Sequence, residues 1–382
     1  MLGASQPCHL TTFDEGIVFQ ASPGTDRQSA TFPLACVTRS GRWWVSFRTA
    51  PTKLKNEGQH VLLTWSDDQG KSWHDPIEPF APPVIDGRPG LLRFGGLTEV
   101  GEGHLVAVVN WVDHSNPELP YFDEATEALL DTRIFLSVSD DAGLTWSPSS
   151  LLDTTPFNVP TPLTGPILTL PDDEWLCQFE LNKAVGDPEP WKHASIFLFS
   201  KDEGRTWPRY TVAAQDPQGR VFYWDQRASV LADGRLLDLF WTFDREKAFY
   251  LNIHAREARD AGRSWSALWD TGVPGQPGPA FTLGDGTLAM PYVDRTGAPA
   301  IRVRRSEDGG RHWPEDSVLT VYASQGVSQT REKQNMGDAW SEMYDFSVGL
   351  PHAARLPAGG ALLVYYAGPK TDVTGIRWAV VR

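Results

Sequence analysis

An eight-residue box that recurs five times constrains the fold of this chain more than any other feature. The first copy, at 66–73, reads Ser-Asp-Asp-Gln-Gly-Lys-Ser-Trp. Close variants lie at 139–146, 200–207, 258–265 and 306–313, with Ala258 replacing the first Ser and His312 replacing the later Ser or Thr. Near-copies repeated at roughly 50 to 70 residues are typical of propellers and solenoids, in which one structural unit recurs along the chain.

The residues of the box predict a mechanical role. Each copy follows a short run of strand-forming residues, such as 61–65 before the first box. The Gly can adopt the positive φ of a tight turn, and the Asp and Ser side chains can bond the turn's own N–H groups. The Trp gives a small turn a large apolar anchor. We therefore expect the boxes to stabilise the fold, far from the chemistry.

The arrangement of strands around the boxes predicts the architecture. Five units of strand, glycine turn, strand, strand and box run without a linker, and a sixth unit at 352–381 has no box and lacks one strand. The N-terminal run 16–20 is a spare strand that can complete the last sheet, which removes exposed sheet edges. We predict one all-β domain over 1–382. It is a six-bladed β-propeller of four-stranded antiparallel sheets, closed by an N-terminal strand that joins the last blade.

Composition excludes several classes of function. The formal net charge is −14 and no Lys/Arg run offsets it, which argues against nucleic-acid binding. Cys8, Cys36 and Cys177 predict no disulfide framework, and no His/Cys/Asp cluster has metal-ligand spacing, so we expect no metal or organic cofactor. No apolar run is long enough to span a membrane, and residues 1–20 lack a signal-peptide pattern. We expect a cytoplasmic protein, or a secreted one whose leader is absent from this sequence.

The propeller fold also predicts where a site lies, because the innermost strands of all blades open into one central funnel. Polar and aromatic residues at these strand ends suit a sugar, since arginines bind anionic substituents and aromatic rings stack on CH faces. The expected catalytic residues are Asp225, Glu180 and Asp345. The expected substrate-binding residues are Arg48, Arg93, Arg227, Arg245, Arg295, Trp241, Tyr292, Glu342, His352 and Tyr366.

Two carboxyl groups are the minimum for most glycosidases. Glu180 lies in an apolar stretch that is expected to raise its pKa, so it is the candidate proton donor. Asp225 lies beside Arg227, which is expected to keep it ionised as a base or nucleophile. Long inserts at 113–132 and 325–344 are expected to form rims or lids over the funnel.

Repeated Asp boxes on six such units resemble the sialidase (neuraminidase) superfamily, also called BNR-repeat proteins, over nearly the whole chain. The resemblance implies three arginines on a substrate carboxylate, a Tyr nucleophile paired with a Glu, and an Asp acid/base. Arg48 matches the arginine that ends the second strand. Asp225 falls at the position of the Glu, one methylene shorter, and Arg295 can stand for the third arginine.

Other positions depart from that pattern. Residues 31–33 read Thr-Phe-Pro where the family has Arg-Ile-Pro, so the first arginine is missing. Trp241 lies near the position of the second arginine, with Arg245 just beyond it, and Leu350 lies near that of the tyrosine. These departures argue against ordinary retaining sialidase activity.

The sequence thus predicts a glycoside hydrolase of sialidase-like fold. It would act on a glycan terminus with an acidic or highly hydroxylated sugar, using paired carboxylates in the funnel. Two alternatives stay open: a polysaccharide lyase, with a Tyr or His base and an Arg or Lys that neutralises a uronate, and a noncatalytic glycan-binding propeller. In each case the expected partner is a carbohydrate, and the oligomeric state is left open.

Overall fold

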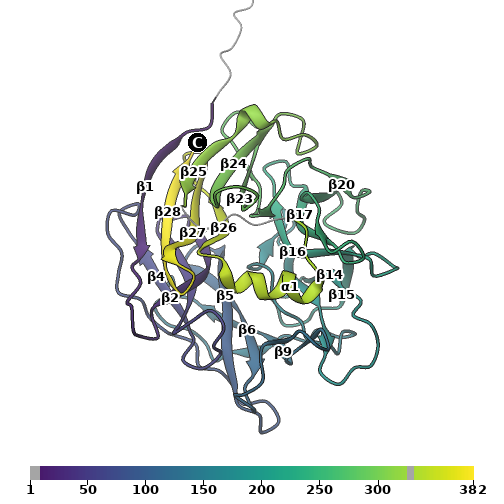
Figure 1. Ribbon diagram of the computed structural model, residues 1–382. Helices are drawn as coiled ribbons and strands as arrows, with labels where there is room; N and C mark the ends of the chain where they lie inside the picture. The colour runs from purple at the N-terminus through teal and green to yellow at the C-terminus, as the bar shows by residue number, and fades with distance from the viewer. Residues whose placement is uncertain (1–8, 325–330) are drawn as a thin grey trace, which may run out of the picture.

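The computed structural model describes residues 9–324 and 331–382, and this part of the chain forms six β-sheet blades around a central axis (Figure 1). Cys8 and residues 325–330 of the second expected insert lie outside the described residues. Within each blade the successive long strands pair antiparallel. The predicted all-β, six-bladed architecture is confirmed.

The strands of the first three blades follow the chain order. Blade 1 consists of β2 (Ser29–Val37), β3 (Trp43–Ala50) and β4 (His60–Ser66), and its fourth strand is reduced to a bridge between Leu63 and Ile77. Blade 2 consists of β5 (Gly90–Gly101), β6 (His104–Asp113), β9 (Thr132–Ser139) and β10 (Ser150–Leu151). Blade 3 consists of β11 (Leu168–Thr169), β12 (Trp175–Leu181), β14 (Ala194–Ser200) and β15 (Arg209–Ala214).

The last three blades continue around the axis. Blade 4 consists of β16 (Val221–Val230), β17 (Leu236–Asp244), β19 (His254–Ala258) and β20 (Trp269–Asp270), with β18 (Phe249–Tyr250) paired to β17. Blade 5 consists of β21 (Gln276–Pro277), β22 (Phe281–Thr282), β23 (Leu288–Asp294), β24 (Ala300–Ser306) and β25 (Leu319–Ala323). Blade 6 consists of β26 (Val348–Arg355), β27 (Ala361–Lys370), β28 (Val373–Val381) and β1 (Thr12–Phe19).

Elements outside the blades are short. A small sheet contains β7 (Phe122–Asp123), β8 (Ala128–Leu129) and β13 (Lys183–Ala184), and thus joins the first insert to the connection between β12 and β14 of blade 3. The helical elements are η1 (Glu315–Ser317), α1 (Met336–Ser341) and η2 (Glu342–Asp345). The side chain of Asn335 caps α1 by accepting a hydrogen bond from the Asp338 N–H.

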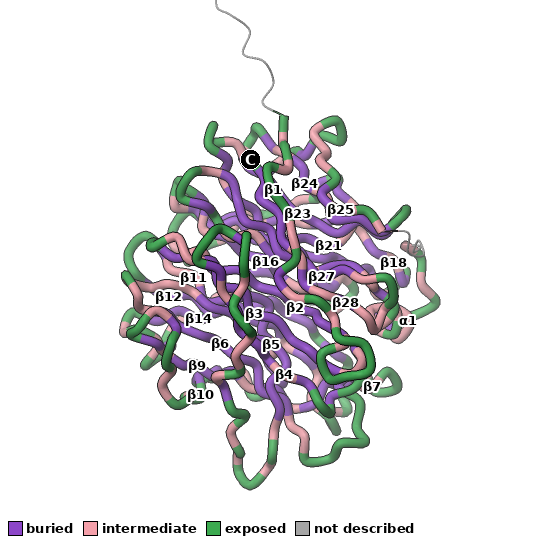
Figure 2. The backbone as a smooth tube through the Cα atoms, turned by 90° about the vertical axis from the view of Figure 1, so that its left-hand side faces the viewer, coloured by how far each residue is buried: buried purple, intermediate pink, exposed green. Residues whose placement is uncertain are grey.

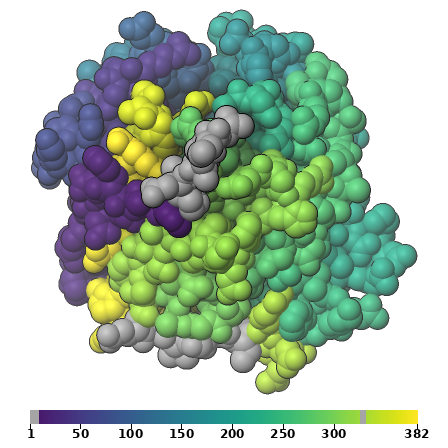
Figure 3. Space-filling view, turned by 90° about the horizontal axis from the view of Figure 1, so that it is seen from above, coloured from purple at the N-terminus to yellow at the C-terminus, as the bar shows by residue number. Residues whose placement is uncertain are grey.

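Strand β1 closes the ring, as predicted. It runs antiparallel to β28, with Gly16 opposite Trp378, and Thr11 and Arg382 exchange two backbone hydrogen bonds of 2.9 and 3.1 Å. Purple N-terminal and yellow C-terminal segments accordingly lie side by side in the view from above (Figure 3). Pairing of the first strand with the last covers the edge that blade 6 would otherwise expose.

The Asp boxes of blades 1 to 5 each pack against the preceding blade. In the second box the Asp141 carboxylate accepts hydrogen bonds from the N–H and hydroxyl of Thr145, at 2.8 and 2.6 Å. The box glycine, Gly143, has φ +93°, and a Cβ built on it would lie 2.5 Å from the Trp44 ring of blade 1. A Cβ built on Gly70 would likewise lie 2.6 Å from the Trp378 ring of blade 6, and one built on Gly262 would lie 2.8 Å from the Phe199 ring of blade 3.

Buried strands run through the interior between these contacts, and exposure is confined mainly to turns and loops (Figure 2). The largest fully buried side chains include Trp44 and Trp111, which fill the space between blades. Close packing between blades fixes the distance of each innermost strand from the axis.

We predict that Gly143→Ala destabilises the protein by about 2 kcal/mol more than Gly103→Ala, because only the first Cβ collides with a neighbouring ring. Both glycines lie in blade 2 at positive φ, and a Cβ on Gly103 would meet nothing within 4 Å. Urea unfolding of the two variants measures the difference. Equal losses of unfolding free energy in the two variants would show that a glycine is needed at the box for its positive φ and not for the contact between blades.

Candidate active site

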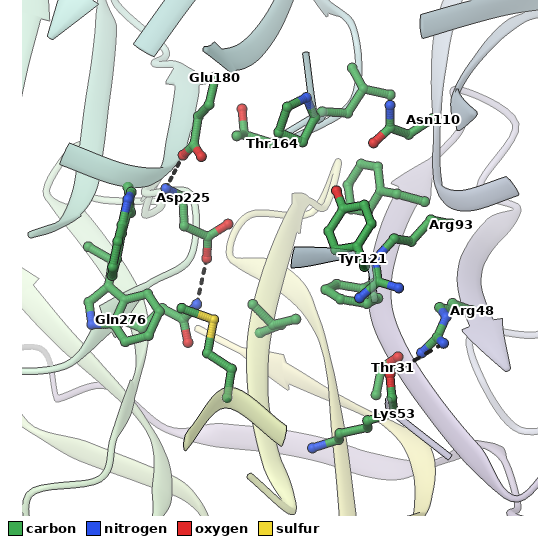
Figure 4. A pocket seen from close by; sticks show the side chains of 18 of the residues that line it. Thr31, Arg48, Lys53, Arg93, Asn110, Tyr121, Thr164, Glu180, Asp225 and Gln276 are labelled. Carbon is green, nitrogen blue, oxygen red and sulfur yellow. Dashed lines mark hydrogen bonds between the residues drawn. The ribbon is translucent and has the colours of Figure 1, made fainter. Parts of the chain in front are cut away.

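A central cavity of about 200 Å³ lies at the end of the axis where the innermost strands open, and all six blades contribute to its wall. Its polar lining residues are Thr31, Arg48, Lys53, Arg93, Asn110, Tyr121, Thr164, Glu180, Asn182, Asp225, Arg227, Gln276, Arg295, Tyr344 and Tyr366. Figure 4 shows many of these side chains converging from different blades on one space.

The innermost strands are distorted where they reach this cavity. The pairing register shifts in β2 around Phe32, in β16 around Asp225 and in β26 around Leu350. These three residues share an unusual backbone conformation, with φ of 53°, 50° and 49°. A bulge re-aims side chains, and strained backbone of this kind is concentrated at functional sites. The same local distortion thus turns residues of blades 1, 4 and 6 toward the axis.

Two carboxyl groups from neighbouring blades meet on one side of the cavity. Glu180 lies near the end of β12, and the strained bulge at Asp225 directs the backbone N–H of Asp225 to Glu180 Oε1 (Figure 4). The other oxygen of Glu180 lies 3.5 Å from Nε2 of His193, whose side chain is fully buried. Both carboxyl groups are therefore held by contacts that leave them in the cavity wall.

The Asp225 side chain is hydrogen-bonded through both of its oxygens. Arg227 forms an ion pair with Oδ1, and the amide of Gln276 donates to Oδ2 at 2.5 Å. Burial nevertheless raises the pKa of Asp225, with the nearby Glu180 acting in the same direction and Arg227 opposing both. The direction is opposite to that expected from Arg227 alone, because the cavity wall excludes water from this carboxyl group.

A chain of contacts leads from Asp225 to the last blade. Gln276 uses its amide oxygen to accept a hydrogen bond of 2.9 Å from Arg295, which fixes the orientation of the amide that bonds Asp225. Arg295 also donates to the carbonyl oxygen of Val348 at 3.0 Å, lies 3.6 Å from the centre of the Phe346 ring, and contacts Tyr366. Burial raises the pKa of Tyr366, and Arg295 opposes this change.

Cationic side chains gather on the opposite side of the cavity, at blades 1 and 2 (Figure 4). Arg48 donates to Gln59 Oε1 at 2.7 Å and to the carbonyl oxygen of Lys55 at 2.9 Å. Arg93 donates to Asn56 Oδ1 at 3.3 Å and lies 3.9 Å from the centre of the Tyr121 ring. Blades 1 and 2 thus contribute cations and no carboxyl group to the lining, whereas blades 3 and 4 contribute both carboxyl groups, with Arg227 beside them.

Aromatic rings form much of the remaining wall. Trp224 and Trp241 come from adjacent strands of blade 4, and Trp340 comes from α1. The α1–η2 segment lies over the middle of the ring in Figure 1, and its Trp340 stacks on Phe122 of the first insert with ring centres 4.0 Å apart. The described parts of both inserts thus cover this end of the axis, as expected for a rim or lid.

The structure brings together most of the residues that the sequence selected. Eight of them line the cavity: Asp225, Glu180, Arg48, Arg93, Arg227, Arg295, Trp241 and Tyr366. Five do not line it: Asp345, Arg245, Tyr292, Glu342 and His352.

Each of these five has another place in the fold. Asp345 is exposed at the end of η2, and Glu342 pairs with Lys333. Arg245 pairs with Glu127, and the Tyr292 hydroxyl accepts a hydrogen bond from Arg304 between strands of blade 5. His352 accepts a hydrogen bond of 3.2 Å from the Ala35 N–H, and burial lowers its pKa to about 3, which keeps the ring neutral.

Sequence reasoning missed Lys53 and Gln276, both of which line the cavity. Lys53 follows the end of the second strand of blade 1, where candidates were sought, but no property of the loop sequence 51–59 marks it as inward-facing. Gln276 and Pro277 form the two-residue strand β21, which is too short to show a strand pattern in the sequence. Only the folded chain shows these two side chains.

The comparisons with known proteins agree with this architecture. The profile of the BNR repeat-like domain family matches residues 123–330, which is more than half of the chain. The protein belongs to this family, and its fold is that of the sialidase-like propellers. No curated protein sequence matches the chain.

Several solved structures share the fold at low sequence identity. A protein of unknown function from Dyadobacter fermentans superposes with a TM-score of 0.72 at 17% identity, over 98% of this chain and 99% of the other. The Hadza microbial sialidase Hz136 superposes with a TM-score of 0.68 at 16% identity, over 96% of this chain and 68% of the other. An intramolecular trans-sialidase from Ruminococcus gnavus, solved in complex with oseltamivir carboxylate, gives 0.62 at 14% identity, over 95% and 96%. At these identities the likeness establishes the fold and not the reaction.

Two negative findings apply to the described residues 9–324 and 331–382. No group of three or more His, Cys, Asp and Glu side chains there is arranged to hold a metal ion. No helix in the same part of the chain is both long and apolar enough to cross a membrane.

We predict that Arg227→Met destabilises the fold by about 2 kcal/mol at neutral pH, because it leaves the buried Asp225 carboxylate without its counter-ion. Loss of the arginine raises the pKa of Asp225 further, so protonation relieves the penalty and the deficit shrinks as the pH falls. Urea unfolding at several pH values measures this trend.

Arg245→Met is the control, because it removes a more exposed ion pair with Glu127 and should change stability by less than about 1 kcal/mol. A deficit of Arg227→Met that stays constant with pH would contradict the assigned cause.

Proposed function

We propose that this protein is a glycoside hydrolase that acts on the terminus of a glycan and holds an acidic or highly hydroxylated sugar in the central cavity. The observation that carries the proposal is the meeting of Glu180 and Asp225, from adjacent blades, in a cavity walled by aromatic rings. Paired carboxyl groups are what glycoside hydrolysis requires, and aromatic rings and polar groups together suit a sugar.

Asp225 is assigned as the base or nucleophile. Both of its oxygens accept hydrogen bonds from cationic or amide groups, which favours the ionised form. Its pKa is nevertheless raised by burial, and a carboxylate of higher pKa is a stronger base. The cavity therefore gives Asp225 a charged form that is positioned for attack or proton abstraction and that holds a proton more tightly than a carboxylate in water.

Glu180 is assigned as the proton donor to the leaving oxygen. Its Oε1 accepts the Asp225 N–H, and its Oε2 lies next to the buried His193 ring, so the side chain is fixed from two sides. Fixed carboxyl groups reduce the entropy lost in reaching the transition state. Trp224 and Trp241 lie beside this pair and can stack on the sugar ring.

A polysaccharide lyase is the second candidate, and one observation favours it. Tyr366 lies beside Arg295 in the same cavity, which is the pairing of a phenol base with a cation that uronate elimination requires. The two reactions have different products, because a lyase leaves an unsaturated sugar that absorbs in the ultraviolet whereas a hydrolase leaves a saturated reducing end.

We predict that Asp225→Asn and Glu180→Gln each lower kcat/KM by at least about a thousandfold, because each removes a carboxyl group that must accept or donate a proton. Activity is measured on aryl glycosides and on uronate-containing polysaccharides, with both products monitored. Asp172→Asn, in an exposed hairpin turn of blade 3, is the control and should keep wild-type activity.

Normal folding of the variants is checked by their melting temperatures. Full activity of a folded Asp225→Asn variant would remove the hydrolase assignment. Loss of activity confined to Tyr366→Phe, with an unsaturated product, would establish the lyase instead. Glycan binding with no turnover of any substrate would leave a binding propeller.

A further inference from the structure

A buried histidine lies behind the carboxyl group that is assigned as the proton donor. His193 immediately precedes β14, and its fully buried side chain places Nε2 3.5 Å from Glu180 Oε2. Glu180 lines the cavity and His193 does not, so the ring reaches the carboxyl group from within the wall. The histidine is therefore placed to act on Glu180 and not on a sugar.

The ring nitrogens of His193 lack partners that their chemistry requires. Neither nitrogen has a hydrogen-bond partner among the described residues. A neutral imidazole has one N–H donor and one unprotonated acceptor nitrogen. A buried N–H without an acceptor is rarer and more costly than a buried acceptor without a donor. The proton therefore belongs on Nε2, the nitrogen that faces a carboxyl oxygen of Glu180.

Aromatic side chains fix the orientation of this ring. Phe222 of blade 4 stacks on His193 with ring centres 5.4 Å apart and an interplanar angle of 27°, and Trp191 contacts it edge-on at 6.0 Å. The Trp191 indole N–H donates to the carbonyl oxygen of Leu181 at 3.1 Å. Leu181 follows Glu180 in β12, so one strand holds both the carboxyl group and the support of the ring. The packing keeps Nε2 directed at Glu180.

The cations near this pair already have carboxylate partners. Arg227 pairs with Asp225 in the cavity wall. Arg245, which lies 5.8 Å from the centre of the Phe222 ring, pairs with Glu127 of the first insert. Each cation is thus engaged by another carboxylate.

The remaining titratable neighbours of Glu180 are neutral groups. Burial raises the pKa of Tyr121 to about 12 and raises the pKa of Asp238 well above its usual range, and Glu180 acts in the same direction on both. The donors that face the two oxygens of Glu180 are then the backbone N–H of Asp225 and the ring of His193.

A contact of 3.5 Å between Nε2 and Oε2 is longer than an ordinary hydrogen bond, and catalytic contacts of this kind often tighten only during the reaction. When Glu180 donates, its O–H bond breaks, an O–H bond forms on the leaving oxygen, and the carboxyl group becomes negatively charged. Hydrogen bonds to a charged group are shorter and stronger than those to a neutral one. An interaction that strengthens in this step lowers the barrier.

We propose that His193 is a positioning residue for proton donation: its Nε2–H holds Glu180 Oε2 and stabilises the carboxylate that forms as Glu180 protonates the leaving oxygen. The proposal deepens the proposed function, on which it rests. His193 keeps its own proton throughout, because the proton that Glu180 loses goes to the leaving oxygen.

The kinetic test compares a phenyl and a dinitrophenyl glycoside of the sugar that the protein hydrolyses in the aryl glycoside screen. A phenyl leaving oxygen requires a proton, whereas dinitrophenolate departs without one. His193→Phe keeps the ring packing and removes the N–H. It should lower kcat/KM at least about tenfold for the phenyl glycoside and less than about threefold for the dinitrophenyl glycoside.

The pH profile gives a second readout of the same variant. The alkaline limb of kcat/KM for the phenyl glycoside should move up by about one pH unit in His193→Phe. The direction is upward because a carboxyl group that loses a donor to its charged form ionises less readily.

Three further variants complete the comparison. His193→Gln keeps an N–H donor on a side chain of similar reach and should recover most of the activity and the wild-type profile. His193→Met replaces His193→Phe should the latter fail to fold. His104→Phe, at a partly exposed histidine of β6 that pairs with Asp140, is the control and should leave both glycosides unaffected.

Nitrogen NMR of protein labelled at its histidine rings tests the contact without a substrate. The His193 signals, assigned by their absence in His193→Gln, should show a neutral ring protonated on Nε2 alone at neutral pH. A ring protonated on Nδ1, alone or together with Nε2, would overturn the proposal.

Other outcomes separate the positioning role from the hydrolase. Equal losses for the two leaving groups, or no recovery in His193→Gln, would reduce His193 to a packing residue. Hydrolysis that His193→Phe does not impair would retain the hydrolase and remove the positioning role. An Nε2-protonated ring in a protein that hydrolyses no glycoside would remove the hydrolase, and the positioning role with it, while retaining the assigned tautomer.

Discussion

Contact between the glycine of an Asp box and an aromatic ring of the preceding blade, made at Gly70, Gly143 and Gly262, is the interaction on which this structure depends. At Gly143 the approach to Trp44 leaves no room for a Cβ, so the two blades are held at a distance that only glycine permits. This contact recurs at three junctions between blades, and β1 completes blade 6, which has no box. Together they constrain where the innermost strands meet the axis. The boxes have no part in the cavity, yet the geometry of the cavity follows from them.

A rigid ring can maintain local strain that an isolated sheet would relax. Phe32, Asp225 and Leu350 occupy left-handed backbone conformations at bulges in three different blades, and all three line the cavity. Such conformations cost on the order of 1 kcal/mol or more each and persist only where surrounding structure enforces them. At Asp225 the conformation has a chemical result, because it directs a backbone N–H to Glu180 and both side-chain oxygens to other partners.

Sequence alone predicted the ring and about half of the polar residues that line the cavity. The boxes and the spare N-terminal strand were sufficient for the fold, because they repeat and because an unpaired edge requires a partner. Arg48, Glu180 and Asp225 were found because they lie at strand ends. Tyr292 and His352 also lie on the innermost strands or beside them, but the alternation of side chains and a register shift turn them into the interior. Lys53 and Gln276 were missed since loop paths and two-residue strands have no pattern that a sequence displays.

The ends of the chain share the cavity wall, and this has a consequence for the shape of the cavity. Lys53 is held by Asp372, and His352 binds the backbone of Ala35 across the join between blades 6 and 1. The loop of blade 1 that holds Lys53 therefore has its observed shape only where blade 6 has packed beside it, because the turn between β27 and β28 supplies its hydrogen-bond partner. The shape of the cavity is thus a property of the closed ring and not of any single blade, since all six blades contribute to its wall.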